Sequence, residues 1–327
     1  MYRVKVYKSI FNKSYFWYTV RCLREMQKEG VLELEIIDSS FFQDHDHAYE
    51  LIFIDGCPVF IDLRDDFTID KQELPNIKED FKILKANYSS ELWDMAEKGI
   101  YPEGVPYRLK DWELPLRKHI RPFALGRTFS TNVKEELKNY NYIGPIKYKV
   151  VSATGVGILK IQSESRIKVY EMFNEIFGGK AKLIYFDKHH GIMKETPDNL
   201  SYYLKKYPID YPIHGIEDYF GFLSLGEYSI NIAGIALSTP FRLVDSVLVG
   251  RCCISTKIWH DVYKTFPCIE LPICGYTGLG DWDKTKVILK DLDKVDYNFL
   301  LQRARNWYDQ FLSTKGMWEN QILRALK

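Results

Sequence analysis

The sequence lacks the features by which several common protein classes are recognised. Its formal net charge is only +1 over 327 residues, whereas proteins that hold nucleic acid carry a basic excess, so we expect no nucleic-acid partner. Its six cysteines include no C-x-x-C pair and are too sparse for a disulfide scaffold, which argues against a zinc site and against secretion. No apolar run approaches the roughly 18 residues of a membrane span. These absences predict a cytoplasmic protein and leave open a peripheral contact with the inner face of a membrane.

The composition that remains is typical of a soluble globular protein, with 46% hydrophobic and 27% charged residues. The length favours two domains, because single domains usually contain on the order of 100–200 residues. The stretch 101–122 is rich in proline and charge and has no clear period, and the pattern becomes more regular after residue 145. We therefore predict one domain over residues 1–135 and a second over residues 136–327.

The first domain shows an α/β pattern. Apolar and basic residues alternate from Tyr2 to Tyr7 as in a strand, Tyr15 to Lys28 carries an apolar helical stripe, and Val31 to Asp38 reads as the next strand. Two further apolar runs, Glu50 to Asp55 and Pro58 to Leu63, are separated by a short turn. They could form a hairpin or two separate strands of the sheet.

In the second domain, strands and helices alternate from residue 147 to residue 273. The predicted strands are Lys147–Ser152, Ala181–Phe186, Pro212–His214, Tyr228–Ala233, Cys252–Ser255 and Ile269–Ile273. The predicted helices between them are Ser165–Phe177, Asn199–Tyr207, Ile216–Leu225, Phe241–Gly250 and Lys257–Thr265. This alternation predicts a doubly wound parallel sheet, because parallel crossovers of one hand leave few other topologies.

Ligands of such sheets bind at the carboxyl ends of the strands, where loops lead into helix N-termini. Three loops qualify, namely Ser152–Gly157, Lys188–Gly191 and Gly234–Pro240. The first contains Gly155 and Gly157 but lacks a third glycine and the Lys-Ser/Thr pair of a P-loop, which disfavours dinucleotide and NTP-hydrolysing enzymes. We interpret it as a ligand-facing loop, with a tight turn as the alternative.

The loop after Tyr228–Ala233 and the helix that follows it contain the largest number of candidate ligand-binding side chains. Ser238 or Thr239 can cap the following helix, Arg242 falls in the first helical turn, and Asp245 follows one turn later. An anion at this helix start would meet backbone N–H groups and a guanidinium together. The alternative is an ordinary Arg–Asp pair on a helix surface.

These positions also carry a family resemblance, at Gly234, Ser238, Arg242, Asp245, Gly250 and Ile254-Ser255. The segment resembles the donor-binding element of GT-B glycosyltransferases, particularly exostosin-like and bacterial polysaccharide enzymes. Ile269–Ile273, the Asp281-Trp-Asp283 helix start and the ending Tyr297–Leu326 follow the same pattern.

The resemblance implies two Rossmann-like domains that face each other across a cleft, with a C-terminal helix that packs back on the N-terminal domain. It implies a hexosyl- or related sugar transferase in polysaccharide synthesis, with a donor domain over 136–327 and an acceptor domain over 1–135. Arg242 would hold the donor diphosphate and Asp245 would contact ribose or sugar hydroxyls. The partners would be a nucleotide sugar as substrate and a glycan or glycolipid acceptor, without a further cofactor.

Sugar transfer by an inverting enzyme also needs a base that takes the acceptor proton. Asp65 and Asp66 directly follow the strand Pro58–Leu63, at a strand end that would face the cleft, and Asp44 and Asp46 are competitors. The run Asp44–His47 could indicate a metal site, because carboxylate and imidazole groups cluster there. We expect no metal, because GT-B enzymes neutralise the leaving diphosphate with Arg, Lys and helix dipoles.

Two other functions stay open at this point. A nucleotide-sugar epimerase of the same architecture would bind the same donor and need no acceptor. A non-catalytic nucleotide- or glycan-binding protein would keep the fold and lose turnover.

Overall fold

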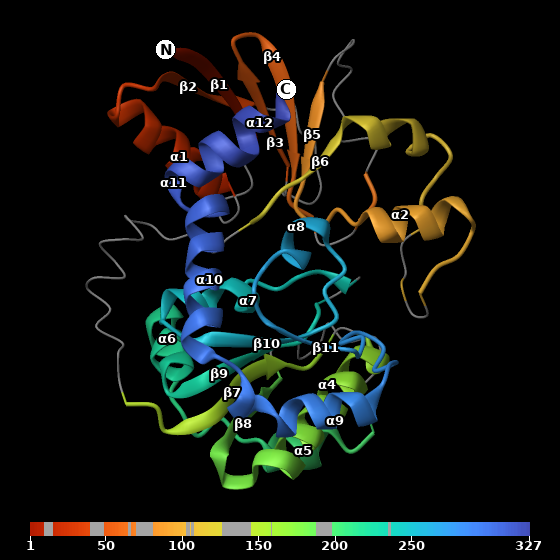
Figure 1. The fold of residues 1–327 in the computed structure, drawn as a ribbon. Helices are drawn as coiled ribbons and strands as arrows, with labels where there is room; N and C mark the ends of the chain where they lie inside the picture. Colours follow the sequence, from red (N-terminus) through yellow and green to blue (C-terminus); the bar gives the residue numbers. More distant parts are fainter. Residues whose placement is uncertain are drawn as a thin grey trace.

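The computed structural model describes residues 1–9, 16–39, 49–64, 67–69, 81–102, 105, 108–125, 145–157, 159–187, 198–234 and 237–327. It contains a six-stranded sheet formed by the N-terminal part of the chain and a five-stranded sheet formed by the C-terminal part. Figure 1 shows the two sheets one above the other, with a long C-terminal helix between them. The predicted α/β class with two Rossmann-like sheets is confirmed.

The N-terminal sheet has the strand order β2-β1-β3-β4-β5-β6. Its strands are β1 (Tyr2–Ser9), β2 (Leu32–Ser39), β3 (Tyr49–Ile54), β4 (Cys57–Asp62), β5 (Lys82–Lys85) and β6 (Ile120–Pro122). Its helices are α1 (Phe16–Lys28), α2 (Ser90–Glu97) and a 3₁₀ helix at Leu114–His119. Only β3 runs against its neighbours, so β3 and β4 form a hairpin. Asp55 and Gly56 both take positive φ in its turn, as type I′ hairpin turns require.

The C-terminal sheet is entirely parallel, with the order β11-β10-β9-β7-β8. Its strands are β7 (Tyr148–Gly155), β8 (Ala181–Phe186), β9 (Gly226–Asn231), β10 (Cys252–Thr256) and β11 (Ile269–Leu271). The helices between these strands are α4 (Lys160–Phe177), α5 (Leu200–Lys206), α6 (Ile216–Ser224), α7 (Arg242–Leu248) and α8 (Asp261–Lys264). After β11 come α9 (Trp282–Lys290) and α10 (Tyr297–Phe311). This is the predicted doubly wound sheet.

Two of the predicted elements are wrong. Residues 212–214 form no strand, because Pro212 has no N–H to donate and the outer side of β8 is met by Tyr207, whose carbonyl oxygen accepts from the N–H of Tyr185 at 2.9 Å. The predicted helix Lys257–Thr265 is reduced to α8, because the N–H of Lys257 donates to the carbonyl oxygen of Ile273 at 2.8 Å and the backbone at His260 is extended. The predicted boundary between residues 135 and 136 lies outside the described residues.

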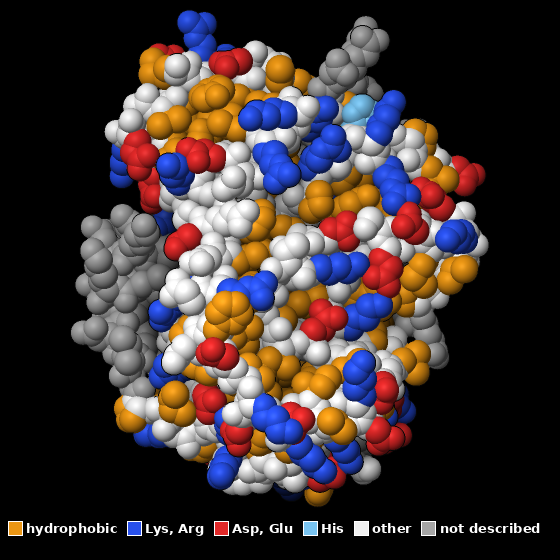
Figure 2. Space-filling model, in the orientation of Figure 1, with side chains coloured by type: hydrophobic (Ala, Val, Ile, Leu, Met, Phe, Trp, Pro, Cys, Tyr) orange, Lys and Arg blue, Asp and Glu red, His pale blue; other side chains and the backbone are white. Residues whose placement is uncertain are grey.

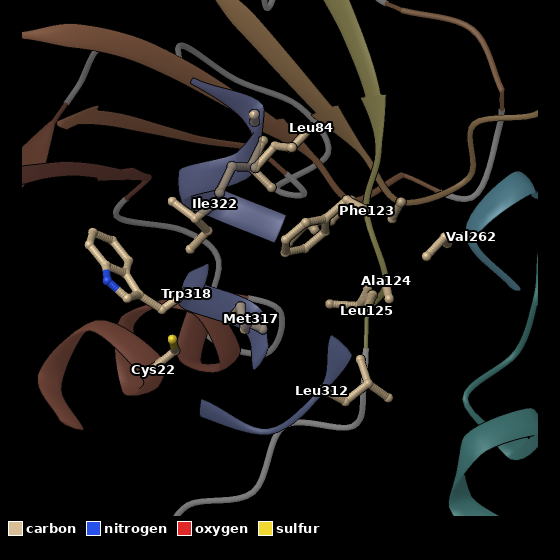
Figure 3. Close-up of a cluster of buried hydrophobic side chains, with 14 of the residues drawn as sticks. Cys22, Leu84, Phe123, Ala124, Leu125, Val262, Leu312, Met317, Trp318 and Ile322 are labelled. Carbon is tan, nitrogen blue, oxygen red and sulfur yellow. The ribbon is translucent and has the colours of Figure 1, made fainter. Parts of the chain in front are cut away.

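The chain after α10 packs back on the N-terminal domain, as expected. It forms α11 (Thr314–Gly316), a π-helical turn at Met317–Ile322 and α12 (Leu323–Ala325). Figure 3 shows Trp318 and Ile322 of this segment among side chains of the N-terminal domain, including Cys22, Leu84 and Phe123. One hydrophobic cluster therefore contains residues of both domains. Within the described part of the chain, no helix is long and apolar enough to cross a membrane.

Candidate functional site

The strand order of the C-terminal sheet reverses between β7 and β9, which makes this position a topological switch point. The chain runs outward from β7 to β8 on one side and then crosses back to add β9, β10 and β11 on the other side. In open parallel sheets, ligands bind outside the carboxyl ends of the strands at such a reversal. The loops at Gly155 and Gly234 follow the two strands that flank it. The sheet topology and the sequence motifs thus indicate the same place.

Arg166 reaches this place from α4. Helical side chains lean towards the N-terminus of their helix, and Arg166 Nη1 donates a hydrogen bond to the carbonyl oxygen of Gly155 at 2.5 Å. The residue is 8% exposed, and its Nε is buried without a hydrogen-bond partner. Burial, and after it the charge of Arg242, lowers the pKa of Arg166 to about 10.

Arg242 begins α7 on the other side of the reversal. Its charge acts on both Arg166 and the buried Tyr170 of α4, so the two guanidinium groups lie within electrostatic reach of each other. Its Nε is also buried without a hydrogen-bond partner. Within the described residues, neither arginine forms an ion pair with a carboxylate. Two neighbouring cations in a low-dielectric site are costly without an anion.

Gly157 packs directly against the first turn of α4. A Cβ atom at this position would lie 2.5 Å from Oε1 and 2.9 Å from Cβ of the fully buried Gln162. The backbone N–H of Gly157 donates to Ser163 Oγ at 2.8 Å. Both amide atoms of Gln162 are buried without a hydrogen-bond partner. The loop therefore brings backbone and unpaired polar groups together beside Arg166.

Ser238 closes the turn that follows β9. Its carbonyl oxygen accepts a hydrogen bond from the N–H of Gly234 at 2.8 Å. The preceding residue, Leu237, takes a φ of 67°, which is unfavourable for a residue with a branched side chain. Strained backbone of this kind is concentrated at functional sites, because the surrounding structure must stabilise it.

Neither Ser238 nor Thr239 caps α7, so that prediction is wrong. The backbone is already helical at Phe241, and among the described residues no side chain caps this helix. Thr239 instead contacts His260, with Oγ1 2.8 Å from Nδ1. Burial, followed by the charges of neighbouring lysines, lowers the pKa of His260 to about 3, so the imidazole is neutral near pH 7.

Asp245 faces the C-terminal helix. The residue is 0% exposed. Burial, with a smaller contribution from the Asp245 carboxylate, raises the pKa of Tyr308 on α10. Asp245 therefore lies within electrostatic reach of α10, on the helix that Arg242 begins.

A third loop belongs to the same edge, and sequence reasoning missed it. Gly275 follows β11, and a Cβ there would lie 2.3 Å from Thr256 Oγ1 and 2.7 Å from the backbone nitrogen of Ala233. Its carbonyl oxygen accepts a hydrogen bond from Ser165 Oγ of α4 at 3.0 Å. Arg166 was also missed. The sequence did contain a signal for Arg166. Residues 162, 166 and 170 are spaced four apart and so share one helix face, and Tyr170 marks that face as buried, which places the polar Gln162 and Arg166 on a buried face.

The candidate bases Asp65 and Asp66 lie outside the described residues, as do Asp44 to His47. The nearest described carboxylate on the same strand is Asp62, which is fully buried between Lys85 and Arg64. Burial alone would raise the pKa of Asp62, but these two cations hold it below its usual value. Asp62 is thus engaged in an internal ion-pair cluster at the carboxyl edge of the N-terminal sheet.

No known protein-family model matches the sequence, and no curated protein sequence matches it. Several solved structures are similar to it at low identity. An α,α-trehalose-phosphate synthase (UDP-forming) from Burkholderia vietnamiensis is 9% identical, with 74% of this chain and 58% of that chain covered and a TM-score of 0.46. HepE from Anabaena, in complex with UDP and glucose, is 10% identical, with 74% and 62% covered and a TM-score of 0.40.

A mutant of TarM from S. aureus, in complex with fondaparinux, α-GlcNAc-glycerol and UDP, is 10% identical. The alignment covers 76% of this chain and 51% of that chain, with a TM-score of 0.40. This chain therefore spans between about half and three-fifths of the length of these structures.

Proposed function

We propose that this protein is a GT-B glycosyltransferase that moves a sugar from a nucleotide-sugar donor to a glycan or glycolipid acceptor, without a metal ion. The observation that carries the proposal is the pair Arg166 and Arg242. They flank the reversal of the C-terminal sheet, they act on each other electrostatically, and neither has a carboxylate partner among the described residues. A diphosphate supplies the missing negative charge.

The start of α4 adds to the same anion site. This helix has 18 residues, and no side chain caps its N-terminus at Leu159. Uncapped N–H groups and the positive end of the helix dipole favour a phosphate. Sugar transfer requires that the departing diphosphate be stabilised, and fixed guanidinium and N–H donors provide this without a metal.

The proposed roles follow from this placement. Arg166 and Arg242 hold the diphosphate, and the backbone at Gly155 and Gly157 approaches it closely. Ser238 and Thr239 shape the turn opposite. The family resemblance implies a ribose contact for Asp245, whereas its full burial towards α10 favours a role in positioning α7. For Asp65 or Asp66, which lie outside the described residues, the proposal that one of them takes the proton of the acceptor hydroxyl rests on the sequence alone.

Isothermal titration with UDP, GDP and their common sugar conjugates tests the donor site. We expect the wild type to bind at least one of them. Arg242→Gln should weaken that affinity about 10- to 100-fold, because a charge-assisted hydrogen bond to phosphate contributes on the order of 1.5–3 kcal/mol. Arg303→Gln is the matched control, since Arg303 is exposed on α10 and lies 5.6 Å from the Phe299 ring. Equal weakening by both variants, or no binding by the wild type, would refute the proposal.

The bound donor then separates transferase from epimerase. A transferase should release nucleotide only when an acceptor glycan is present, and the sugar should appear on that acceptor. Free nucleotide and 2-epimer without an acceptor would assign the epimerase reaction instead, and binding without turnover would assign a non-catalytic role.

A further inference from the structure

Four basic side chains lie together on the N-terminal domain. Lys82 and Arg121 share one face of the neighbouring strands β5 and β6. Ile83 and Ile120 are paired and point to the opposite face. Arg121 pairs with Leu84, which lies two residues after Lys82 and therefore on the same face as Lys82. Arg324 lies on α12, which packs against β5 on that face. Lys118 adjoins Arg121, whose Nη1 donates to the Lys118 carbonyl oxygen at 2.9 Å. We call Lys82, Lys118, Arg121 and Arg324 the basic face.

The charges of the basic face are not neutralised within the described structure. None of its four side chains forms an ion pair with a described carboxylate, and Lys118, Arg121 and Arg324 are exposed. The neighbouring Arg117 is different, because it pairs with both Asp94 and Glu97. Figure 2 shows Lys and Arg side chains gathered over the upper part of the molecule, around α12, β5 and β6. Since the whole chain carries a formal charge of only +1, this excess is local.

Exposed apolar side chains belong to the same domain. Met1 is 79% exposed and Tyr2 is 37% exposed at the start of β1. The Tyr2 ring lies edge-on to Trp318, with 5.5 Å between ring centroids, in the segment that leads into α12. Exposed basic and exposed apolar side chains on one domain suit a lipid surface, where cations meet headgroup phosphates and apolar groups enter the interface.

We propose that the basic face docks the protein on a membrane that contains anionic phospholipids. The partner is the negatively charged headgroup layer, and the contact is peripheral and reversible. The proposal does not rest on glycosyl transfer, because membrane binding requires neither donor nor acceptor.

Vesicle co-sedimentation of the full chain tests the proposal. The protein should partition onto phosphatidylcholine vesicles that contain about one third phosphatidylglycerol, and much less onto pure phosphatidylcholine. The triple variant Lys118→Gln/Arg121→Gln/Arg324→Gln should weaken partitioning about 100-fold, since each basic residue near an anionic surface contributes about fivefold. Raising the salt from about 0.1 to about 0.5 M should weaken wild-type binding as well.

The matched control removes the same number of charges from the C-terminal domain. Lys180, Lys284 and Lys290 are exposed there and form no ion pair with a described carboxylate, so Lys180→Gln/Lys284→Gln/Lys290→Gln should partition like the wild type. Thermal unfolding of both triple variants verifies that they fold. Equal loss of binding in both variants, no preference for anionic vesicles, or binding to single-stranded DNA with no binding to vesicles would each overturn the proposal.

Discussion

Glu50 is an acidic side chain inside the N-terminal domain without a cationic partner in the described structure. It lies on β3, is 1% exposed, and has the Thr19 hydroxyl of α1 as its polar neighbour. Burial raises the pKa of Glu50 to about 8, and Thr19 opposes this only weakly. The folded protein therefore holds a proton at pH 7 that the unfolded chain has released.

This residue predicts a pH dependence of stability. Between its usual pKa of 4.5 and about 8, the native state binds the extra proton, so a rise in pH favours unfolding. We expect the free energy of unfolding to fall by on the order of 3 kcal/mol from about pH 5 to about pH 9. Chemical denaturation of Glu50→Gln over this interval should show a much flatter curve. Glu33→Gln, an exposed control in the same domain, should keep the wild-type slope, and parallel curves for all three proteins would contradict the assignment.

At the scale of the element, the turn from β7 into α4 depends on the absence of a side chain at Gly157. Gly157→Ala places a Cβ against Gln162, which is fixed in the first helical turn and cannot move away. We expect a loss of about 1–3 kcal/mol in the free energy of unfolding. Gly179→Ala is the control at the other end of the helix, since a Cβ there meets nothing within 4 Å, and it should be neutral or slightly stabilising. Equal effects of the two changes would show that the tight contact is not energetically important.

The same elements show what the sequence could and could not predict. Periodicity located the strands of the C-terminal sheet, because apolar residues recur in each strand and alternate along the chain with helical patterns. It placed the start of α4 five residues late, at Ser165 instead of Lys160, since Lys160 and Gln162 do not fit an apolar stripe. Periodicity also predicted too long a helix after Lys257. The N–H of Lys257 donates to the carbonyl oxygen of Ile273 at 2.8 Å, so the helix begins only at Asp261. Such tertiary contacts override local propensity.

Some residues of the candidate site could also be identified from the sequence, and others could not. Gly155, Gly157 and Arg242 could be selected from the sequence because they follow strands in a recognisable order. Arg166 could not, since its role depends on the fold that brings α4 beside α7. The helix cap assigned to Ser238 or Thr239 failed because Thr239 takes a partner, His260, that lies on a different strand–helix connection.

At the scale of the whole molecule, the two domains are joined by buried contacts as well as by the chain. The hydroxyl of Tyr263 on α8 lies 2.7 Å from the backbone nitrogen and 2.8 Å from the carbonyl oxygen of Leu125, which follows β6. The same hydrophobic cluster contains Val244 of α7, Trp307 of α10 and Val20 of α1. Neither domain buries this surface alone.

A shared core predicts that the domains unfold together. Scanning calorimetry should give a single transition whose calorimetric and van't Hoff enthalpies agree. Tyr263→Phe should lower the stability by about 2–3 kcal/mol, because the backbone N–H and carbonyl of Leu125 would stay buried without partners. Tyr202→Phe, on an exposed tyrosine, should leave the transition unchanged. If calorimetry shows two separate transitions and Tyr263→Phe shifts neither, the hydroxyl contact and the common cluster do not couple the domains. If there is a single transition and Tyr263→Phe moves it as a whole, the N-terminal domain is stabilised through α8 and the C-terminal segment.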